Sequence, residues 1–219
     1  MIIGRCLNRV RTSIDTIVSK HIIREDKAFL ACFGDRRLRN RKTLTMREMH
    51  NVYKLVEQSG KLRGDLAEVG VYRGGSARII CEFKGQRNLH LFDTFAGMPM
   101  VDKRVDRHRQ GDFADTSIEA VQAFLSGFQN VYYHKGCFPE TANAVLNCTF
   151  SMVHIDVDIY KSTLDCLRFF YPRMTRGGFI LSHDYRTLLG VRKAFADFFA
   201  DKPEQILELW DTQCLVAKT

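Results

Sequence analysis

The stretch DLAEVGVYRGGSA, residues 65–77, decides the fold, because a short apolar run passes through a glycine-rich turn into a helical pattern. LAEVG at 66–70 has the length and composition of a buried strand, and SARIICEF at 76–83 has the spacing of a helix. The same alternation continues along the chain. It predicts strands at 89–93, 131–134, 151–156 and 178–184, helices at 116–127, 162–171 and 191–200, and a closing hairpin from 206–210 and 213–217.

Alternating strands and helices predict an α/β fold, with a doubly wound and mainly parallel sheet of seven strands that ends in an antiparallel hairpin. In such sheets, ligands bind beyond the carboxyl ends of the strands, where the strand order reverses. We therefore look for the site at the ends of the predicted strands. Four acidic residues stand in or at the ends of these strands: Glu68, Asp93, Asp156 and Asp184.

The glycine-rich turn favours a cationic ligand over a phosphate. Gly70 permits a tight turn, and Gly74 with Gly75 lets the backbone approach a ligand closely. The dinucleotide fingerprint needs a glycine where Tyr72 stands, and no GK[ST] sequence follows for a phosphate loop. Glu68 beside the turn would repel a pyrophosphate and attract S-adenosylmethionine, which carries a sulfonium and an ammonium. A purely structural glycine turn is the alternative.

Two further residues are candidates for holding a nucleoside. Asp93 ends the second predicted strand, 23 residues after Gly70. A carboxylate about twenty residues after the first glycine is well placed to accept hydrogen bonds from both ribose hydroxyls. Next to the glycine-rich turn we favour this role over a turn cap. Phe138, in the turn GCFPET at 136–141, could stack on an adenine or be an ordinary core residue.

Histidine and aspartate residues gather at the ends of the fourth and fifth predicted strands, in HIDVD at 154–158 and SHDY at 182–185. If the strand geometry continues through the first of these, His154, Asp156 and Asp158 share one face. Since neighbouring parallel strands end at the same edge, the two motifs are expected to meet there.

Asp156, His183 and Asp184 could hold a divalent cation at this edge. Mg²⁺ prefers oxygen ligands, and the imidazole of His183 shifts the preference toward Mn²⁺, Fe²⁺, Co²⁺ or Zn²⁺. Such a cation would lower the pKa of a substrate hydroxyl, and Asp156 or His183 could accept the proton. On spacing alone, it is equally plausible that these groups cap helices and bond to one another.

Composition places the chain among soluble globular proteins. Its 219 residues are 45% hydrophobic and 26% charged, which suits one domain with an appendage. No apolar run approaches the ~18 residues of a membrane span, and charged residues interrupt the start, so we expect neither a signal peptide nor a membrane segment. The 7 cysteines include no CxxC pair, which disfavours a disulfide framework or a thiolate zinc site. We expect a cytoplasmic protein with free thiols.

Positive charge is concentrated near the start of the chain. Residues 1–63 carry 15 Lys and Arg against 6 Asp and Glu, whereas the remainder carries 18 against 19. We therefore divide the chain into a basic helical region, 1–63, and a main domain, 64–219. Thr45 and Glu48 predict a capping box for a helix that ends at Gly60. The basic region is a candidate wall of the substrate pocket or an oligomer contact. RRLRNRK at 36–42 has no interleaved aromatics, which disfavours a nucleic-acid surface.

Five motifs, taken in order, resemble the macrocin O-methyltransferase (TylF-like) family, class I S-adenosylmethionine-dependent enzymes that methylate sugar hydroxyls on antibiotics. The resemblance covers roughly residues 64–216 and rests on DLAEVGVYRGGSA, LHLFDTFAGMP, KGCFPET, HIDVDIYKSTLDCLRFFYPRMTRGG and SHDY. It implies the class I methyltransferase fold for residues 64–219, with seven strands and a final antiparallel hairpin.

The resemblance also implies site residues. Those implied for the cofactor are Glu68, Gly70 and Gly74 in the turn, Tyr72 and Arg73 as an aromatic–arginine pair, and Asp93 on the ribose. Asp156 matches the family's first metal-binding aspartate and proposed general base. His183 and Asp184 fall where the family usually has two adjacent aspartates. Because of this departure, three alternatives stay open: the site binds Mg²⁺, it binds another metal such as Mn²⁺, or His183 acts as the base.

We therefore expect an S-adenosylmethionine-dependent O-methyltransferase, which forms a homo-oligomer and acts on a hydroxyl of a sugar or a glycosylated small molecule. The polar segment 94–116 is expected to close over the cofactor. Two alternatives stay open. One is an RNA-directed methyltransferase that uses residues 1–63 as a phosphate-binding surface. The other is a non-catalytic protein that retains the fold.

Overall fold

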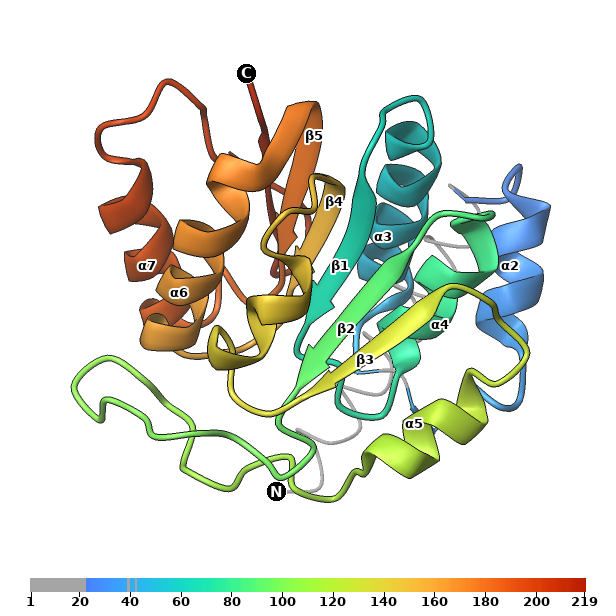
Figure 1. Cartoon of the computed structure of the whole chain (residues 1–219), viewed down its shortest axis with the longest axis horizontal. Coiled ribbons are helices and arrows are strands. Elements are labelled where there is room, and N and C mark those ends of the chain that lie inside the picture. The colour runs from blue at the N-terminus through green and yellow to red at the C-terminus, as the bar shows by residue number, and fades with distance from the viewer. Residues whose placement is uncertain (1–22, 39, 42) are drawn as a thin grey trace, which may run out of the picture.

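A seven-stranded sheet forms the centre of the computed structural model, which describes residues 23–38, 40, 41 and 43–219 (Figure 1). The strands are β1 (Asp65–Val69), β2 (Leu89–Asp93), β3 (Val131–Lys135), β4 (Phe150–Ile155), β5 (Met174–Ser182), β6 (Leu207–Glu208) and β7 (Cys214–Ala217). Their order is β3-β2-β1-β4-β5-β7-β6. β1 to β5 are parallel, whereas β7 runs antiparallel to both β5 and β6. The predicted fold class is confirmed, although β6 is shorter than the strand predicted at 206–210.

Helices cover both faces of the sheet, as a buried parallel sheet requires. The helices are α2 (Lys27–Gly34), α3 (Met46–Ser59), α4 (Gly75–Phe83), α5 (Ile118–Phe124), α6 (Tyr160–Phe170) and α7 (Leu189–Phe199), with 3-10 turns η1 (Glu140–Val145) and η2 (Tyr171–Arg173). In Figure 1, α6 and α7 lie on one side of the sheet and α2, α3 and α4 on the other. Two buried hydrophobic clusters fill the two interfaces. Every residue of β4 is buried, in keeping with its central place.

The predicted capping box at the start of α3 is confirmed. The Thr45 hydroxyl accepts a hydrogen bond from the Glu48 amide at 3.2 Å, and Glu48 Oε2 accepts one from the Thr45 amide at 2.8 Å. The buried face of the helix includes Met49, Val52 and Val56, which belong to the same hydrophobic cluster as residues of β1 and α4. The N-terminal helix therefore shares a core with the main domain.

The start of α5 differs from the prediction, which placed a capping box at Thr116 and Glu119. Ser117 is the N-cap instead, and its hydroxyl accepts a hydrogen bond from the Ala120 amide at 3.1 Å. The Thr116 hydroxyl donates to the carbonyl of Tyr72, and so fastens the end of the preceding segment to the β1–α4 turn. From the sequence, either Thr116 or Ser117 could cap this helix. The hydrogen bond from Thr116 to Tyr72 leaves Ser117 as the cap.

The strand order reverses between β1 and β4, and the backbones that follow these two strands are in close contact there. The Asp156 amide donates to the carbonyl of Val69 at 2.8 Å, and the Gly70 amide donates to that of Phe92 at 2.9 Å. Gly70 has a φ of +88°, and a Cβ at this position would lie 1.8 Å from the carbonyl oxygen of Asp156. Only glycine lets the carboxyl ends of these strands meet in this way.

Two sequence-based expectations bear on the chain as a whole. Among the residues that the structure describes, no helix is long and apolar enough to cross a membrane. The described cysteines form no disulfide: Cys32, Cys81, Cys137, Cys148, Cys166 and Cys214. Cys6 lies outside the described residues.

We expect Gly70→Ala to lower the free energy of unfolding by more than the ~1–3 kcal/mol of a strained backbone position alone, because the new methyl group also overlaps the backbone of Asp156. Urea denaturation measures this. The matched control is Gly127→Ala, because nothing lies within 4 Å of a Cβ at Gly127. We expect that control to stay within ~0.5 kcal/mol of the parent. Equal midpoints for the two variants would show that the β1–β4 edge relaxes freely.

Candidate active site

A cavity of about 520 Å³ lies at the carboxyl ends of β1, β2, β4 and β5. Its walls come from the β1–α4 turn, the segment 94–115, the turn at 136–140, the first turns of α6 and the end of β5. Seven of the residues predicted from the sequence line it: Gly70, Tyr72, Asp93, Phe138, Asp156, His183 and Asp184. Three others, Glu68, Arg73 and Gly74, are not among its lining residues.

Asp93 organises the turn beside the cavity. Its Oδ2 accepts hydrogen bonds from the amides of Val71 and Tyr72, both at 2.7 Å, and its Oδ1 accepts one from the Phe95 amide at 2.7 Å. The carboxylate therefore caps turns, which was the structural alternative for this residue. These three hydrogen bonds use both lone pairs of Oδ2 and one of Oδ1, so Asp93 keeps capacity for about one further donor, at Oδ1.

The two glycines at the start of α4 have different structural roles. Gly74 is the N-cap, with a φ of +81°, and a Cβ there would lie 3.3 Å from the side chain of Val121. It therefore serves the close packing of α5 rather than the approach of a ligand. Gly75 and Ser76, in the first turn of α4, line the cavity. Of the two glycines predicted to let the backbone approach a ligand, Gly75 therefore borders the cavity and Gly74 does not.

Arg73 braces the turn from outside the cavity, where the sequence placed it beside the cofactor. Its guanidinium pairs with the carboxylate of Asp115 and lies 5.1 Å from the ring centroid of Tyr72. The Tyr72 hydroxyl also donates to Asp115 Oδ1 at 2.7 Å. These contacts hold the end of the segment 94–115 against the β1–α4 turn.

Glu68, two residues before Gly70, pairs with His154 inside the fold and does not line the cavity, and its predicted role toward the cofactor stays a prediction. Glu68 Oε1 lies 2.8 Å from His154 Nδ1, and neither side chain is exposed. The two residues stand in register on β1 and β4. Burial raises the pKa of Glu68, although the hydrogen bond with His154 opposes this. The pair joins neighbouring strands beneath the cavity.

Four ionisable side chains gather where β4 and β5 end. Donor atoms of Asp156, Asp158, His183 and Asp184 all lie within 4.8 Å of one another. His183 Nδ1 is 3.0 Å from Asp156 Oδ1 and 3.0 Å from Asp184 Oδ2. β4 ends at Ile155 and Asp158 has a φ of +61°, so the predicted shared face with His154 is wrong. Asp158 reaches the group through a turn instead.

Burial and charge act in opposite directions within this group. Burial alone would lower the pKa of His183, but the neighbouring carboxylates, Asp156 first among them, raise it overall. Burial also opposes ionisation of Asp184, yet the hydrogen bond with His183 lowers its pKa to about 2. Asp158 shows the reverse outcome, because burial and the charges of Asp156 and Asp184 raise its pKa well above the usual value.

Glu48 is a functional candidate that the sequence analysis identified only as a helix cap. Its side chain is 2% exposed, and Oε1 lies 3.5 Å from His183 Nε2. The same oxygen accepts hydrogen bonds from the Thr212 hydroxyl at 2.6 Å and the Thr212 amide at 3.1 Å. Burial opposes ionisation of Glu48, but the contact with His183 lowers its pKa to about 2. Glu48 therefore caps α3 with one oxygen and holds His183 with the other.

The cluster of Asp156, Asp158, His183 and Asp184 fits a divalent cation. Three carboxylates against one imidazole leave excess negative charge, which adds to the effect of burial in raising the pKa of Asp158. A divalent cation would balance it, and the imidazole nitrogen suits Mn²⁺ better than Mg²⁺. Because His183 Nδ1 already bridges two carboxylates, the imidazole would have to give up a proton to bind metal through that atom.

Aromatic and polar residues form the remaining walls. Phe138 borders the cavity and packs against Phe170 with nearly parallel rings, at a centroid distance of 5.2 Å. The structure therefore makes Phe138 both a cavity wall and part of an aromatic cluster. Met100, which is 78% exposed, and Lys161 and Asp165 of α6 line the outer part. The cavity thus combines a deep part beside β1 and β2 with an outer part that offers apolar and charged groups.

Solved structures with this arrangement of strands include methyltransferases. The structure of the O-methyltransferase NovP matches with a TM-score of 0.73 at 22% identity, over 82% of this chain and 82% of that one. An O-methyltransferase from Bacillus cereus in complex with SAH matches with a TM-score of 0.63 at 13% identity, over 94% of this chain and 97% of that one. These likenesses establish the fold.

Sequence comparison adds the family. A curated relative from Streptomyces olivaceus, 8-demethyl-8-(2,3-dimethoxy-alpha-L-rhamnosyl)-tetracenomycin-C 4'-O-methyltransferase, is 30% identical over 138 residues, which are 56% of this chain and 53% of that protein. The chain spans between 53% and 63% of the length of the curated relatives it matches. Residues 32–214, well over half of the chain, match the family described as Macrocin-O-methyltransferase (TylF). The chain therefore belongs to the macrocin O-methyltransferase (TylF) family.

Proposed function

We propose that this chain is an S-adenosylmethionine-dependent O-methyltransferase whose acceptor is a hydroxyl of a sugar or of a glycosylated small molecule. One observation carries the proposal: a single cavity joins the Asp93 turn, which suits a nucleoside, to the carboxylates and imidazole at Asp156 and His183. The family and the named rhamnosyl-tetracenomycin methyltransferase support the acceptor class.

The cofactor would lie over the carboxyl ends of β1 and β2. Asp93 would accept a hydrogen bond from one ribose hydroxyl at Oδ1 while it holds the turn amides. The backbone around Gly70 and Gly75 would face the methionine part, and Phe138 would border the adenine. Residues of the turn thus supply shape and hydrogen bonds, with few side chains to collide with the ligand.

The reaction would be an in-line displacement. The acceptor oxygen attacks the methyl carbon, the carbon–sulfur bond breaks, and S-adenosylhomocysteine leaves as a neutral thioether. Holding the reactants aligned and in contact can supply ~7–11 kcal/mol of the barrier. Because His183 holds Asp156 Oδ1, the other oxygen of Asp156 is the proposed proton acceptor for the hydroxyl. His183 and Glu48 would position this carboxylate.

We also propose that Asp156, Asp158, His183 and Asp184 bind a divalent cation, with Mn²⁺ or Mg²⁺ as the candidates. When bound, such a cation lowers the pKa of a hydroxyl at its open position. The chain's own contribution is to hold four donor atoms close together at the floor of the acceptor side.

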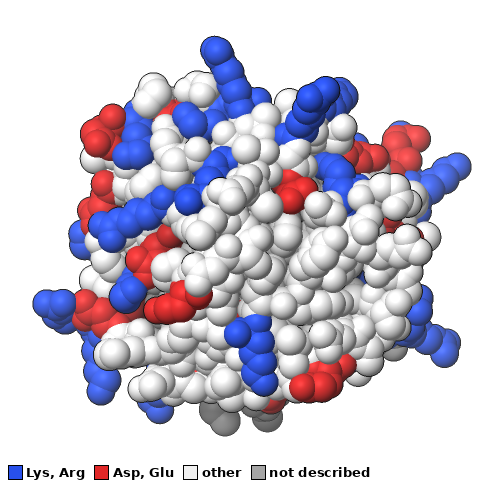
Figure 2. Space-filling model, viewed as in Figure 1, with Lys and Arg blue, Asp and Glu red and all other residues white. Residues whose placement is uncertain are grey.

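Surface charge supports a small acceptor over RNA. Figure 2 shows that lysines and arginines are scattered over this face, and many stand beside acidic residues. Of the arginines in the described N-terminal part, Arg37 pairs with Asp35, whereas Arg41 lines the cavity and donates to the carbonyl of Arg73 at 2.9 Å. Residues 1–22, with Arg39 and Lys42, lie outside the described residues, so the predicted homo-oligomer contact there stays a prediction.

We expect isothermal calorimetry to show binding of S-adenosylmethionine and S-adenosylhomocysteine by the chain, and Asp156→Asn to keep that binding. Turnover with a glycosylated acceptor should fall ~10²–10⁴-fold in this variant, because it removes the proton acceptor. Asp197→Asn, which removes a surface carboxylate paired with Lys193, is the matched control and should change neither quantity. Equal loss of binding and turnover in Asp156→Asn would mean a structural role, and no binding by the parent chain would refute the proposal.

Glu48→Gln should reduce kcat ~10–100-fold with unchanged affinity for S-adenosylhomocysteine, because it weakens the group that positions His183. The amide keeps one oxygen, which can serve the Thr45 cap, but its NH2 group then faces the Thr212 amide, so kcat and affinity are compared at a temperature well below the thermal midpoint. Glu57→Gln, on the exposed side of the same helix beside Lys54, serves as the control. A fall in kcat that tracks a fall in thermal midpoint would instead indicate loss of packing alone.

Removal of metal with a chelator should lower turnover, and Mn²⁺ should restore it at lower concentration than Mg²⁺ because of the imidazole donor. The concentration of Mn²⁺ for half-restoration should rise in Asp184→Asn, which removes one donor. If turnover is unchanged after chelation, and no metal is found in the protein, the cation is excluded and the protein side chains act alone.

A further inference from the structure

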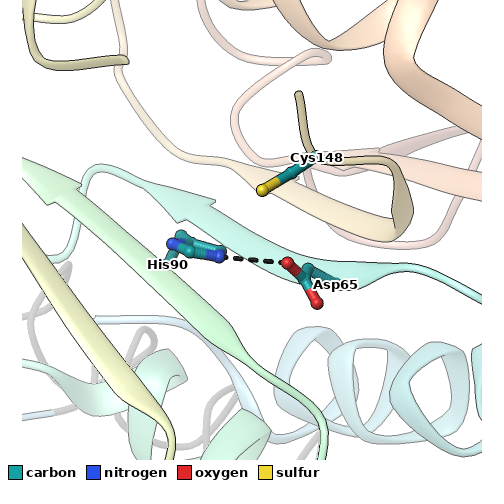
Figure 3. A group of neighbouring side chains, drawn as sticks. All are labelled: Asp65, His90 and Cys148. Atoms are coloured by element: carbon teal, nitrogen blue, oxygen red, sulfur yellow. Dashed lines mark hydrogen bonds and ion pairs between the residues drawn. The ribbon is translucent and has the colours of Figure 1, made fainter. Parts of the chain in front are cut away.

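A second group of metal-ligand side chains lies at the opposite edge of the sheet, where the parallel strands begin. Asp65 starts β1, His90 lies in β2, and Cys148 precedes β4 (Figure 3). One donor atom from each lies within 4.8 Å of the other two. We propose that Asp65, His90 and Cys148 form a zinc-binding site, with water as the fourth ligand, separate from the active-site cavity.

The distances suit a tetrahedral zinc ion. Zinc binds nitrogen and oxygen at ~2.0–2.2 Å and thiolate at ~2.3 Å, so two ligand atoms of a tetrahedral site lie ~3.3–3.7 Å apart. Here His90 Nε2 and Asp65 Oδ2 are 3.2 Å apart. In Figure 3 the sulfur of Cys148 faces the space between these two side chains. Side-chain movements of less than about 1 Å would therefore complete the geometry.

The side chains of His90 and Asp65 each make a hydrogen bond through the atom that would not bind zinc, as metal ligands in proteins usually do. His90 Nδ1 lies 3.1 Å from His134 Nε2, and the side-chain Nδ2 of Asn88 donates to Asp65 Oδ1 at 3.1 Å. If His90 donates through Nδ1 to His134, its Nε2 carries the lone pair that zinc needs. The carboxylate likewise keeps Oδ2 for the metal.

The charges of the group match zinc. A thiolate and a carboxylate together neutralise a dipositive ion, and a neutral imidazole completes the set. Burial lowers the pKa of both His90 and His134, the latter to about 4, so the imidazoles are neutral at physiological pH. Burial and the neighbouring Asp65 carboxylate raise the pKa of Cys148, so without a metal the sulfur stays a thiol.

The thiol also selects the ion. A site with sulfur, nitrogen and oxygen donors favours zinc over the hard ions Mg²⁺ and Ca²⁺. Access is available, because the side chain of Asp65 is 22% exposed and Cys148 is half-buried. A bound zinc would connect the first residues of β1, the second strand and the turn before β4, and would stabilise the folded state through binding.

Cobalt substitution tests the site with the whole chain. Co²⁺ added alone to the metal-free protein should give a sulfur-to-cobalt charge-transfer band, which one equivalent of Zn²⁺ then removes. Cys148→Ser should abolish the band. Cys137→Ser is the matched control, because Cys137 is an exposed cysteine in the active-site cavity, and it should retain the band.

A second measurement covers the case in which Cys148→Ser folds poorly. Zn²⁺ should raise the thermal midpoint of the parent chain and of Asp184→Asn by clearly more than that of His90→Gln, which keeps only the group at Asp156 and His183. We expect His134→Phe, which removes only the outer hydrogen bond, to weaken zinc binding ~10–100-fold. No charge-transfer band in the parent, a band that persists in Cys148→Ser, or a zinc response equal in parent and His90→Gln would each overturn the proposal.

Discussion

The approach of Gly70 to the carbonyl of Asp156 is the contact on which the rest of the site depends. A side chain at Gly70 would overlap the Asp156 backbone, so this one position lets β1 and β4 end side by side. Asp156 can then hydrogen-bond back to Val69, and the turn amides after Gly70 can reach the carboxylate of Asp93. The two sides of the cavity, at Asp93 and at Asp156, are thus joined through a single backbone crossing.

Charge within the cavity is controlled by one imidazole among several carboxylates. His183 lies within 3.5 Å of carboxylate oxygens from Asp156, Asp184 and Glu48, which belong to three different parts of the chain. An imidazolium at that place holds two of the carboxylates ionised, as the low pKa values of Glu48 and Asp184 indicate. At Asp158, burial and the charges of Asp156 and Asp184 outweigh the effect of His183, and the pKa is raised. The carboxylates of this group therefore carry the negative charge that attracts a metal cation, and the imidazolium of His183 competes with that metal for them.

Much of this arrangement could be predicted from local sequence, and the failures have a common cause. Strand ends and glycine positions located Asp93, Asp156, His183 and Asp184 correctly at one cavity. The pairing of Glu68 with His154 was not predicted, because a parallel strand buried on both faces shows no alternation, so the sequence does not tell which face a residue takes. Glu48 looked like a cap because its contact with His183 joins a helix to a strand end far along the chain. Nonlocal packing, rather than local propensity, determines which partner each of these two residues contacts.

The two ends of the sheet differ in the chemistry they offer, and the difference follows from the strands themselves. At the carboxyl ends, the chain leaves the sheet in turns that expose several aspartates to one cavity, which suits a hard cation and an exchangeable substrate. At the amino ends, Asp65, His90 and Cys148 come from strand starts and a turn whose backbone is fixed by neighbouring hydrogen bonds, such as that between the Asp65 amide and the Thr149 carbonyl at 2.8 Å. A rigid group with a sulfur donor suits a softer ion that stays bound. One sheet can therefore separate catalytic and structural metal chemistry, because the same parallel strands present different residues at their two ends.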